Sequence, residues 1–318
     1  MLEVLYLLIP SAMIYATPLI FAGIGGVFSE RSGVVNIGLE GIMVMGAFIS
    51  IYVNLTYYET FGHDVIWISL LAALVVGGLF SILLAVAAVT FRADQTVTGV
   101  ALNMLGVAVA IFSVKMIYDG KGQTDNILAP IRSMDIKYLS DIPIIGKMFF
   151  TNIYWVTIIA FVVAILAWLM IYKTPFGLRI RAVGEHPMAA DTMGINVART
   201  RYTAVIISGA LGGVGGAVVA MTFALNFSSA TIAGQGFMAI AAMIFGKWHP
   251  LGTLGAALFF GLAQTLAVLG RQIPYVQDVP QVFLQILPYV LTILALAGFI
   301  GKAVAPKASG QPYIKGKR

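Results

Sequence analysis

Long, uninterrupted runs of apolar residues dominate the pattern of this chain. An α-helix rises 1.5 Å per residue, so about 20 residues are needed to cross ~30 Å of hydrocarbon. A shorter apolar stretch, Ile232–Phe245, could be a short span, a tilted span or a re-entrant segment. The pattern predicts eight further spans, with the limits Val4–Phe28, Val34–Tyr57, Val65–Phe91, Val97–Ile117, Ile153–Tyr172, Tyr202–Leu225, Leu251–Leu269 and Val282–Ile300.

The basic residues indicate how these spans are oriented. Lysine and arginine favour the cytoplasmic side of a membrane, and here they concentrate in the connection 173–201 and in the tail 302–318. If both are cytoplasmic, the chain crosses an even number of times between them, so Ile232–Phe245 counts as a span. We therefore expect nine spans with the N-terminus outside, the C-terminus inside and 118–152 as an external loop. Residues 1–301 then form one transmembrane domain.

The composition agrees with an all-α polytopic membrane protein. Of the 318 residues, 60% are hydrophobic and 10% are charged, and the mean hydropathy is +0.95, whereas a soluble domain carries roughly 25% charged residues. The formal charge is +6, but the basic residues lie in short connections between apolar runs. This distribution favours contact with membrane lipid and argues against a nucleic-acid partner. The absence of cysteine excludes disulfides and cysteine-ligated metal sites.

Sequence signatures of ATP binding and of metal-dependent hydrolysis are absent. There is no G-x-x-x-x-G-K-[ST] loop and no H-E-x-x-H pair. Ion-driven transporters usually hold several ionisable groups deep in the bilayer, but Glu40 is the only acidic residue inside a predicted span. We therefore expect no catalytic residues, no metal and no cofactor in this chain, and an energy source that belongs to a partner.

Polar residues inside the predicted spans are candidate contacts for a transported solute. Asn36 and Glu40 are four residues apart, so we expect them to share one face of a helix. A carboxylate within a span usually faces the bundle interior or an aqueous cavity, which leaves both a structural hydrogen-bond network and a substrate contact open. The candidate pathway residues are Asn36, Glu40, Asn103 and Gln264.

The stretch RIRAVGEHPMAADTMGINVARTR, Arg179–Arg201, predicts a short helix between two spans. We expect Gly184 to break the chain, Pro187 to lie in the first turn and Gly194 to end the helix. One interpretation is an interfacial helix that anchors the loop to the membrane. The other is a rigid knob that docks into a cytoplasmic partner.

Three segments resemble a known family. GEHPMAADTMGI resembles the coupling-loop pattern Gly-x-x-x-x-Ala-Ala-x-x-x-Gly-Ile of ATP-binding cassette (ABC) import permeases for branched-chain amino acids, simple sugars and nucleosides. SGVVNIGLEGIMVMGAF resembles the signature around the second span of this branch. VPQVFLQILPYVLTILALAG resembles the end of its nucleoside and simple-sugar permeases, and the resemblance extends from about Phe21 to Gly301.

The resemblance implies an ABC importer permease fold and one subunit of a nucleoside importer in a bacterial cytoplasmic membrane. A cytoplasmic ATPase with two nucleotide-binding domains would bind ATP and magnesium. A second, homologous permease would complete a heterodimer, and an extracellular substrate-binding lipoprotein would deliver the solute. The residues that the resemblance assigns to ATPase coupling are Gly184, Glu185, His186, Pro187, Ala189, Ala190, Gly194 and Ile195.

Two alternatives stay open. Within the same class, the chain could be a permease for ribose or another simple sugar. In a different class, it could be a stand-alone channel or facilitator for small polar solutes, since a facilitator also lacks ion-coupling residues. A facilitator has no use for a docking helix, so Ala190→Arg is expected to abolish transport only in an importer.

Overall fold

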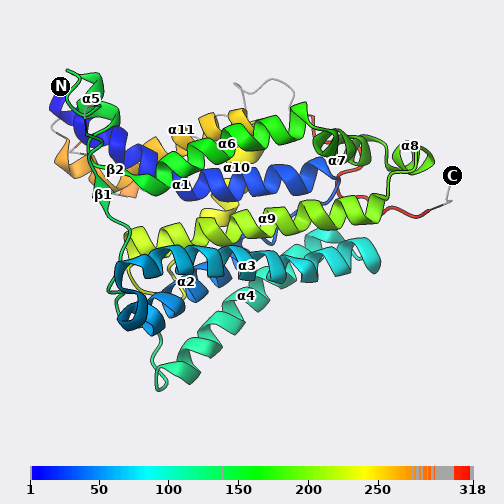
Figure 1. The fold of residues 1–318 in the computed structure, drawn as a ribbon, viewed down its shortest axis with the longest axis horizontal. Coiled ribbons are helices and arrows are strands. Elements are labelled where there is room, and N and C mark those ends of the chain that lie inside the picture. Colours follow the sequence, from blue (N-terminus) through cyan, green and yellow to red (C-terminus); the bar gives the residue numbers. More distant parts are fainter. Residues whose placement is uncertain are drawn as a thin grey trace.

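The computed structural model describes residues 2–315, apart from positions 138, 274, 275, 277, 278, 281, 285, 288, 289 and 291–303. Long helices lie side by side in one bundle (Figure 1). The helices are α1 (Leu2–Arg31), α2 (Leu39–Phe61), α3 (Val65–Ala85), α4 (Gln95–Ile117), α5 (Ile145–Phe149), α6 (Trp155–Lys173), α7 (Pro175–Glu185), α8 (Pro187–Thr192), α9 (Val197–Val219), α10 (Gln235–Phe245) and α11 (Pro250–Leu269). Single turns of other helix types are Gly62–Asp64, Val86–Thr90, Ala220–Ala224 and Gly270–Gln272, and the strands are β1 (Ser133–Met134) and β2 (Ile153–Tyr154).

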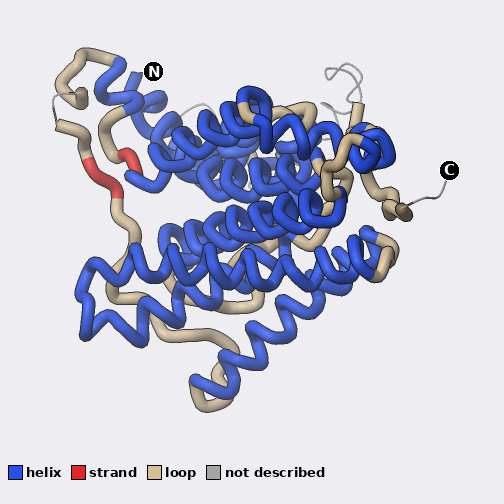
Figure 2. The backbone as a smooth tube through the Cα atoms, turned by 45° about the vertical axis from the view of Figure 1, so that its right-hand side comes forward, coloured by secondary structure: helices blue, strands red, loops and turns tan. Residues whose placement is uncertain are grey.

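The bundle has two distinct ends. At the strand end, β1 and β2 pair antiparallel with Ser133 opposite Tyr154, and α5 and the N-terminus lie nearby (Figure 1). At the α8 end lie α7, α8 and the C-terminal segment (Figure 1). Figure 2 shows α4 leaning away from the other helices. Its side chains Met104 and Met116 are largely exposed, so α4 presents an apolar surface to lipid or to another subunit.

Seven of the predicted apolar runs correspond to long helices, with limits that agree within six residues. Among the described residues, six continuous helical stretches are long and apolar enough to cross a membrane. One of them, Leu39–Thr90, contains both α2 and α3, joined by the turn Gly62–Asp64. The run Val282–Ile300 falls mostly on residues outside the described ones, so a count of nine spans stays a prediction.

The stretch Ile232–Phe245 forms a half-length helix preceded by non-helical chain. α10 has 11 residues, which makes it about 16 Å long, roughly half the thickness of the hydrocarbon layer. Before α10, the Phe227 carbonyl accepts a hydrogen bond from the Thr124 N–H (3.0 Å) at the strand end. After α10, the Trp248 carbonyl accepts one from Arg31 at the α8 end (2.8 Å). The chain therefore passes from one end to the other as an irregular segment followed by half a helix.

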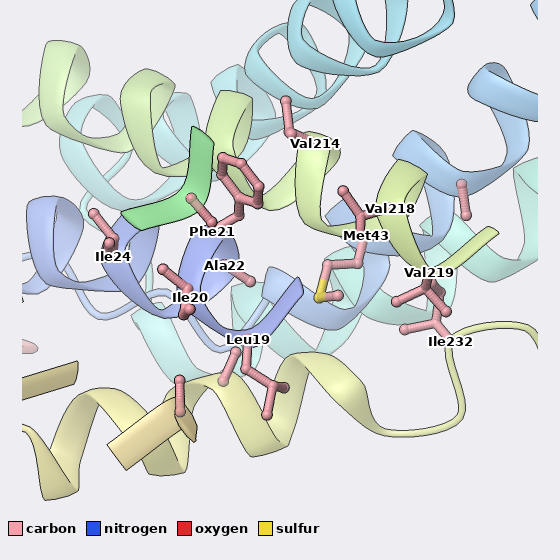
Figure 3. Close-up of a cluster of buried hydrophobic side chains, with 14 of the residues drawn as sticks. Leu19, Ile20, Phe21, Ala22, Ile24, Met43, Val214, Val218, Val219 and Ile232 are labelled. Atoms are coloured by element: carbon pink, nitrogen blue, oxygen red, sulfur yellow. The ribbon is translucent and has the colours of Figure 1, made fainter. Parts of the chain in front are cut away.

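Helix α1 runs through the middle of the bundle and supplies much of the core. Its residues Leu19, Ile20 and Ile24 have no exposed surface, and a helix that is apolar on every side is expected to be buried on every side. The cluster in Figure 3 joins α1, α2, α9 and the segment before α10, through Leu19, Ile20, Phe21, Ala22, Ile24, Met43, Val214, Val218, Val219 and Ile232.

Glycines allow α9 to approach α2 and α3 closely. A Cβ on Gly213 would collide with the Ala73 carbonyl of α3, and a Cβ on Gly216 would collide with the Met43 carbonyl of α2. Small residues at these positions let helix backbones pack together in the absence of a hydrophobic driving force between spans. The position of α9 between its two neighbours therefore depends on these glycines.

Gly216→Ala is expected to destabilise the protein, because the added methyl group overpacks the contact with Met43 at a typical cost of about 1–3 kcal/mol. Gly255→Ala is the matched control, since a Cβ at Gly255 in α11 meets nothing within 4 Å. The thermal midpoint of the detergent-purified variants checks this, and equal midpoints would contradict the close approach of α9 and α2.

Candidate functional site

The short helix predicted within Arg179–Arg201 is present as α8. Thr174 caps α7, its hydroxyl accepting from the Gly177 N–H at 3.3 Å. At His186, φ −144° and ψ 81° redirect the chain, and Pro187 then begins α8. Gly194 ends this turn with φ +81°, its N–H donating to the Asp191 carbonyl at 2.9 Å. A left-handed glycine at this place is a common helix terminator.

The prediction that Gly184 breaks the chain is wrong. Gly184 lies inside α7, and the direction changes two residues later, at His186. A Cβ on Gly184 would collide with the carbonyl of Arg31 at the end of α1. The glycine is required because α7 crosses the end of α1 at backbone contact distance.

α8 and Met193, the residue that follows it, expose two large apolar side chains to solvent. Met193 is 82% exposed and Met188 is 46% exposed. Ala190 is only 4% exposed and packs against Val183 and Val197. Of the residues assigned to coupling, His186, Ala189 and Gly194 are exposed, Glu185, Pro187 and Ile195 are half-buried, and Gly184 and Ala190 are buried.

The position of Ala190 changes how docking must be tested. An arginine there would disrupt the packing of α8 on α7 and α9, so Ala190→Arg would abolish transport for structural reasons as well. Met193, which contacts the solvent, is the better position for a substitution that affects docking alone.

The C-terminal segment 304–315 is packed against this region. The Ala308 N–H donates to the Gly184 carbonyl at 2.9 Å. Arg201, 1% exposed, donates from Nε to the Ser32 carbonyl (3.2 Å) and from Nη1 to the Gln311 carbonyl (3.0 Å). A buried guanidinium is costly unless it is hydrogen-bonded. Arg201 thus joins α9 to the turn after α1 and to the tail.

Glu40 holds the start of the half-length helix. Its two carboxylate oxygens accept hydrogen bonds from the backbone N–H groups of Gly234 and Gly236, each at 2.7 Å. The first N–H groups of a helix lack partners within the helix, and the partial positive charge there favours an anion. Glu40 therefore caps α10 within the apolar bundle, where Gly236 is buried and Glu40 and Gly234 are half-buried.

Asn36 and Glu40 do not share a helix face, contrary to the prediction from their spacing. α2 begins only at Leu39, and Asn36 lies in the irregular turn that precedes it. The amide of Asn36 donates to the Ser208 hydroxyl of α9 at 2.9 Å. Glycines at 33 and 38, the first with φ +89°, keep this turn from continuing as helix.

Asn103 and Gln264 differ in how fully their amides are paired. Asn103 accepts from the Gly41 N–H (2.7 Å) and donates to the Ile37 carbonyl (3.0 Å), so it ties α4 to the start of α2. Gln264 donates weakly to Gln235 (3.3 Å) and Met238, while its buried Oε1 has no partner among the described residues. Among all the residues that the structure describes, no three His, Asp or Glu side chains are placed to hold a metal ion.

A cluster of polar and aromatic side chains, namely Glu30, Arg31, Tyr172, Trp248 and His249, lies at the α8 end of the bundle. The Glu30 carboxylate accepts from the indole N–H of Trp248, and Arg31 donates to the Tyr172 hydroxyl at 3.1 Å. The ring of His249 lies 4.8 Å from that of Tyr172. Burial, and then the positive charge of Arg31, lower the pKa of His249, which favours the neutral imidazole. The cluster connects α1, α6 and the loop after α10.

The comparisons with known proteins identify the family to which the chain belongs. Residues 8–296 match the family described as branched-chain amino acid transport system, permease component. The chain belongs to this permease family. The permease is 57% identical to the guanosine ABC transporter permease protein NupQ of Bacillus subtilis, over 99% of both chains. It is 53% identical to the nucleoside ABC transporter permease protein NupC of Lactococcus lactis, over 98% of both.

A more distant relative comes from the same Bacillus strain as NupQ. The guanosine ABC transporter permease protein NupP is 24% identical to this permease over 92% of the chain and 81% of its own length. Two different permease proteins of one strain thus carry the guanosine name, and both are similar to this chain.

Sequence reasoning missed the permease's second buried carboxylate and its buried guanidinium. Glu30 and Arg201 were assigned to cytoplasmic connections, because each stands next to other charged or polar residues at the edge of an apolar run. In the structure α1 continues to Arg31 and α9 begins at Val197, so both side chains lie on helices and are buried. No periodicity in the sequence distinguishes them from exposed charges.

Glu40→Leu is expected to destabilise the permease, because it leaves the N–H groups of Gly234 and Gly236 without acceptors. An orphaned, buried N–H such as that of Gly236 costs roughly 1–3 kcal/mol. Glu40→Gln retains one acceptor oxygen and should fall between Leu and the wild type. The thermal midpoints of the three purified proteins test this order. A wild-type midpoint for Glu40→Leu would contradict the capping role.

Proposed function

We propose that this permease is one transmembrane subunit of an ATP-driven importer of nucleosides. The 57% identity to NupQ over nearly the whole chain carries the proposal. The exposed apolar surface of α8 supports it, because a permease without an ATP-binding loop needs a docking site for its energy source. ATP and magnesium are bound by a partner ATPase with two nucleotide-binding domains.

The proposed assembly lies in a bacterial cytoplasmic membrane with nine spans per permease. The α8 end faces the cytoplasm, as the basic residues of the 173–201 connection and of the tail favour. A second, homologous permease forms the other half of a heterodimer, by analogy with the two permeases NupP and NupQ. An extracellular lipoprotein delivers the nucleoside to the strand end.

The contacts of α8 suggest how docking reaches the pathway. α8, the coupling helix of this proposal, connects through His186 to α7, and α7 touches the end of α1 at Gly184. Arg31 in turn holds the chain after α10, while Glu40 holds the start of α10. Closure of the ATPase would shift α8 and, through these contacts, move α10 relative to α2, which changes access to the pathway.

Among the four candidate pathway residues, Gln264 is the best placed to contact solute. The side-chain oxygen and nitrogen of Asn103 and both carboxylate oxygens of Glu40 are hydrogen-bonded to the backbone of this chain. The Oε1 of Gln264 and the Oδ1 of Asn36 lack such partners within the described residues, but Asn36 is 1% exposed whereas Gln264 is 9% exposed. A carboxamide suits a neutral, polar ligand such as a nucleoside, which offers both donors and acceptors.

Uptake of labelled guanosine tests the function and separates it from the alternatives. The permease is expressed with its companion permease, ATPase and binding protein in a host that lacks nucleoside uptake. We expect ATP-dependent accumulation that unlabelled guanosine suppresses and that ribose leaves unchanged. Suppression by ribose would identify a simple-sugar permease. Equilibration without accumulation, independent of the partners, would identify a facilitator.

Met193→Arg is expected to reduce both ATPase co-purification and guanosine uptake by about tenfold or more, because an exposed apolar contact becomes a charge. Met193→Leu is the control, since it keeps an apolar side chain of similar volume. Both variants should retain the thermal midpoint of the wild type. Normal ATPase recovery with Met193→Arg would refute the docking role of α8.

A further inference from the structure

The C-terminal tail lies beside α8 and is fastened to the bundle at several points. Ala308 is 5% exposed and bonded to Gly184. Gln311 is held by the buried Arg201. Tyr313 packs against the small cluster that contains Ala190. The tail therefore holds a defined position next to the predicted coupling helix, as the red segment in Figure 1 shows.

Between α8 and the tail the structure has an open groove with a volume of about 910 Å³. One wall is formed by the beginning of α8, including Met188 and Ala189. The opposite wall is formed by the tail, including Lys307, Pro312 and Ile314. Met188 and Ala189 line the groove and also form part of the exposed surface of α8. A protein that docks on this face of α8 would therefore also contact the tail.

The chemistry of the tail indicates what it would bind. Residues 302–318 contain five basic residues and no acidic residue. Within the groove, Lys307 on the tail wall is exposed beside the apolar residues Pro312 and Ile314, while Glu185 lies on the α8 wall. A complementary surface would present an apolar ridge with a carboxylate on the edge that faces the tail, because charge complementarity steers association and suppresses wrong partners.

We propose that α8 and the tail form one composite docking surface, and that the groove between them receives an acidic-edged apolar ridge of the partner ATPase. The proposal rests on the proposed function for the identity of this partner. It adds a second contact to the coupling helix, at a segment that Arg201 connects directly to the turn after α1. The ATPase would then hold the permease at two places that are joined inside the bundle.

Cysteine protection tests the proposal without disturbing the fold, because the chain contains no native cysteine. Pro312→Cys places a thiol on the tail wall of the groove, and Val304→Cys places one at a tail residue that does not line it. In the complete complex, we expect maleimide to label Cys at position 312 about tenfold more slowly than in the permease pair without ATPase. Labelling at position 304 should not change.

Charge substitutions provide the second test. Ile314→Asp opposes an acidic partner and should reduce the co-purified ATPase by about tenfold, whereas Val304→Asp should retain it. Both variants should keep the second permease and the wild-type thermal midpoint. If Ile314→Asp loses stability, the labelling experiment alone decides.

The outcomes distinguish this proposal from the proposed function. Loss of the ATPase with Met193→Arg, combined with full labelling at position 312 in the complex, would overturn the composite surface and leave α8 as the docking site. Retention of the ATPase in every variant, with unprotected thiols, would overturn both the composite surface and the docking role of α8. Protection at position 312 by the second permease alone would assign the groove to the permease pair and also overturn the proposal.

Discussion

Inside an apolar bundle, each backbone N–H and C=O needs a partner from the protein itself, and this constraint determines where the polar residues of this permease lie. Among the described residues, the chain is irregular inside the bundle in the turn before α2 and in the segment before α10. Glu40 satisfies the exposed N–H groups at the second place, and Asn36 and Asn103 fix the first. In a lipid-exposed position such irregular backbone would be too costly. The polar side chains therefore allow the chain to leave regular helix in the interior of the bundle.

The glycines meet a related constraint. Contact between spans in lipid depends on van der Waals packing at short range, because apolar side chains gain little by leaving lipid for protein. Gly213 and Gly216 let α9 touch α3 and α2 through their backbones. Gly184 does the same where α7 meets α1. The two groups of contacts differ in consequence: the first fixes the bundle, and the second joins α7 to it.

Features that depend on local pattern could be predicted from the sequence. The apolar runs located the long helices, and Pro187 and Gly194 located the short helix α8. The half-length of α10 was open from the sequence, because Ile232–Phe245 is apolar apart from Gln235, and the residue that caps the helix, Glu40, lies 194 residues away from Gly234 in the chain. Asn36 was misplaced for a similar reason. Its spacing from Glu40 suits a helix, but the glycines around it favour a turn that tertiary contacts then stabilise.

The turn after α1 is the place where the parts of the α8 end meet. Arg31 touches α7 at Gly184 and holds Trp248 after α10. Ser32 accepts a hydrogen bond from Arg201, which also holds the tail. A few residues later the same chain forms the first turn of α2, from which Glu40 reaches α10. A displacement of α8 would thus act on both ends of α10, at its start through Glu40 and at its finish through Arg31. The half-helix is short and its start is held by one carboxylate, so Glu40 and Arg31 are the two places where such a displacement would reach it.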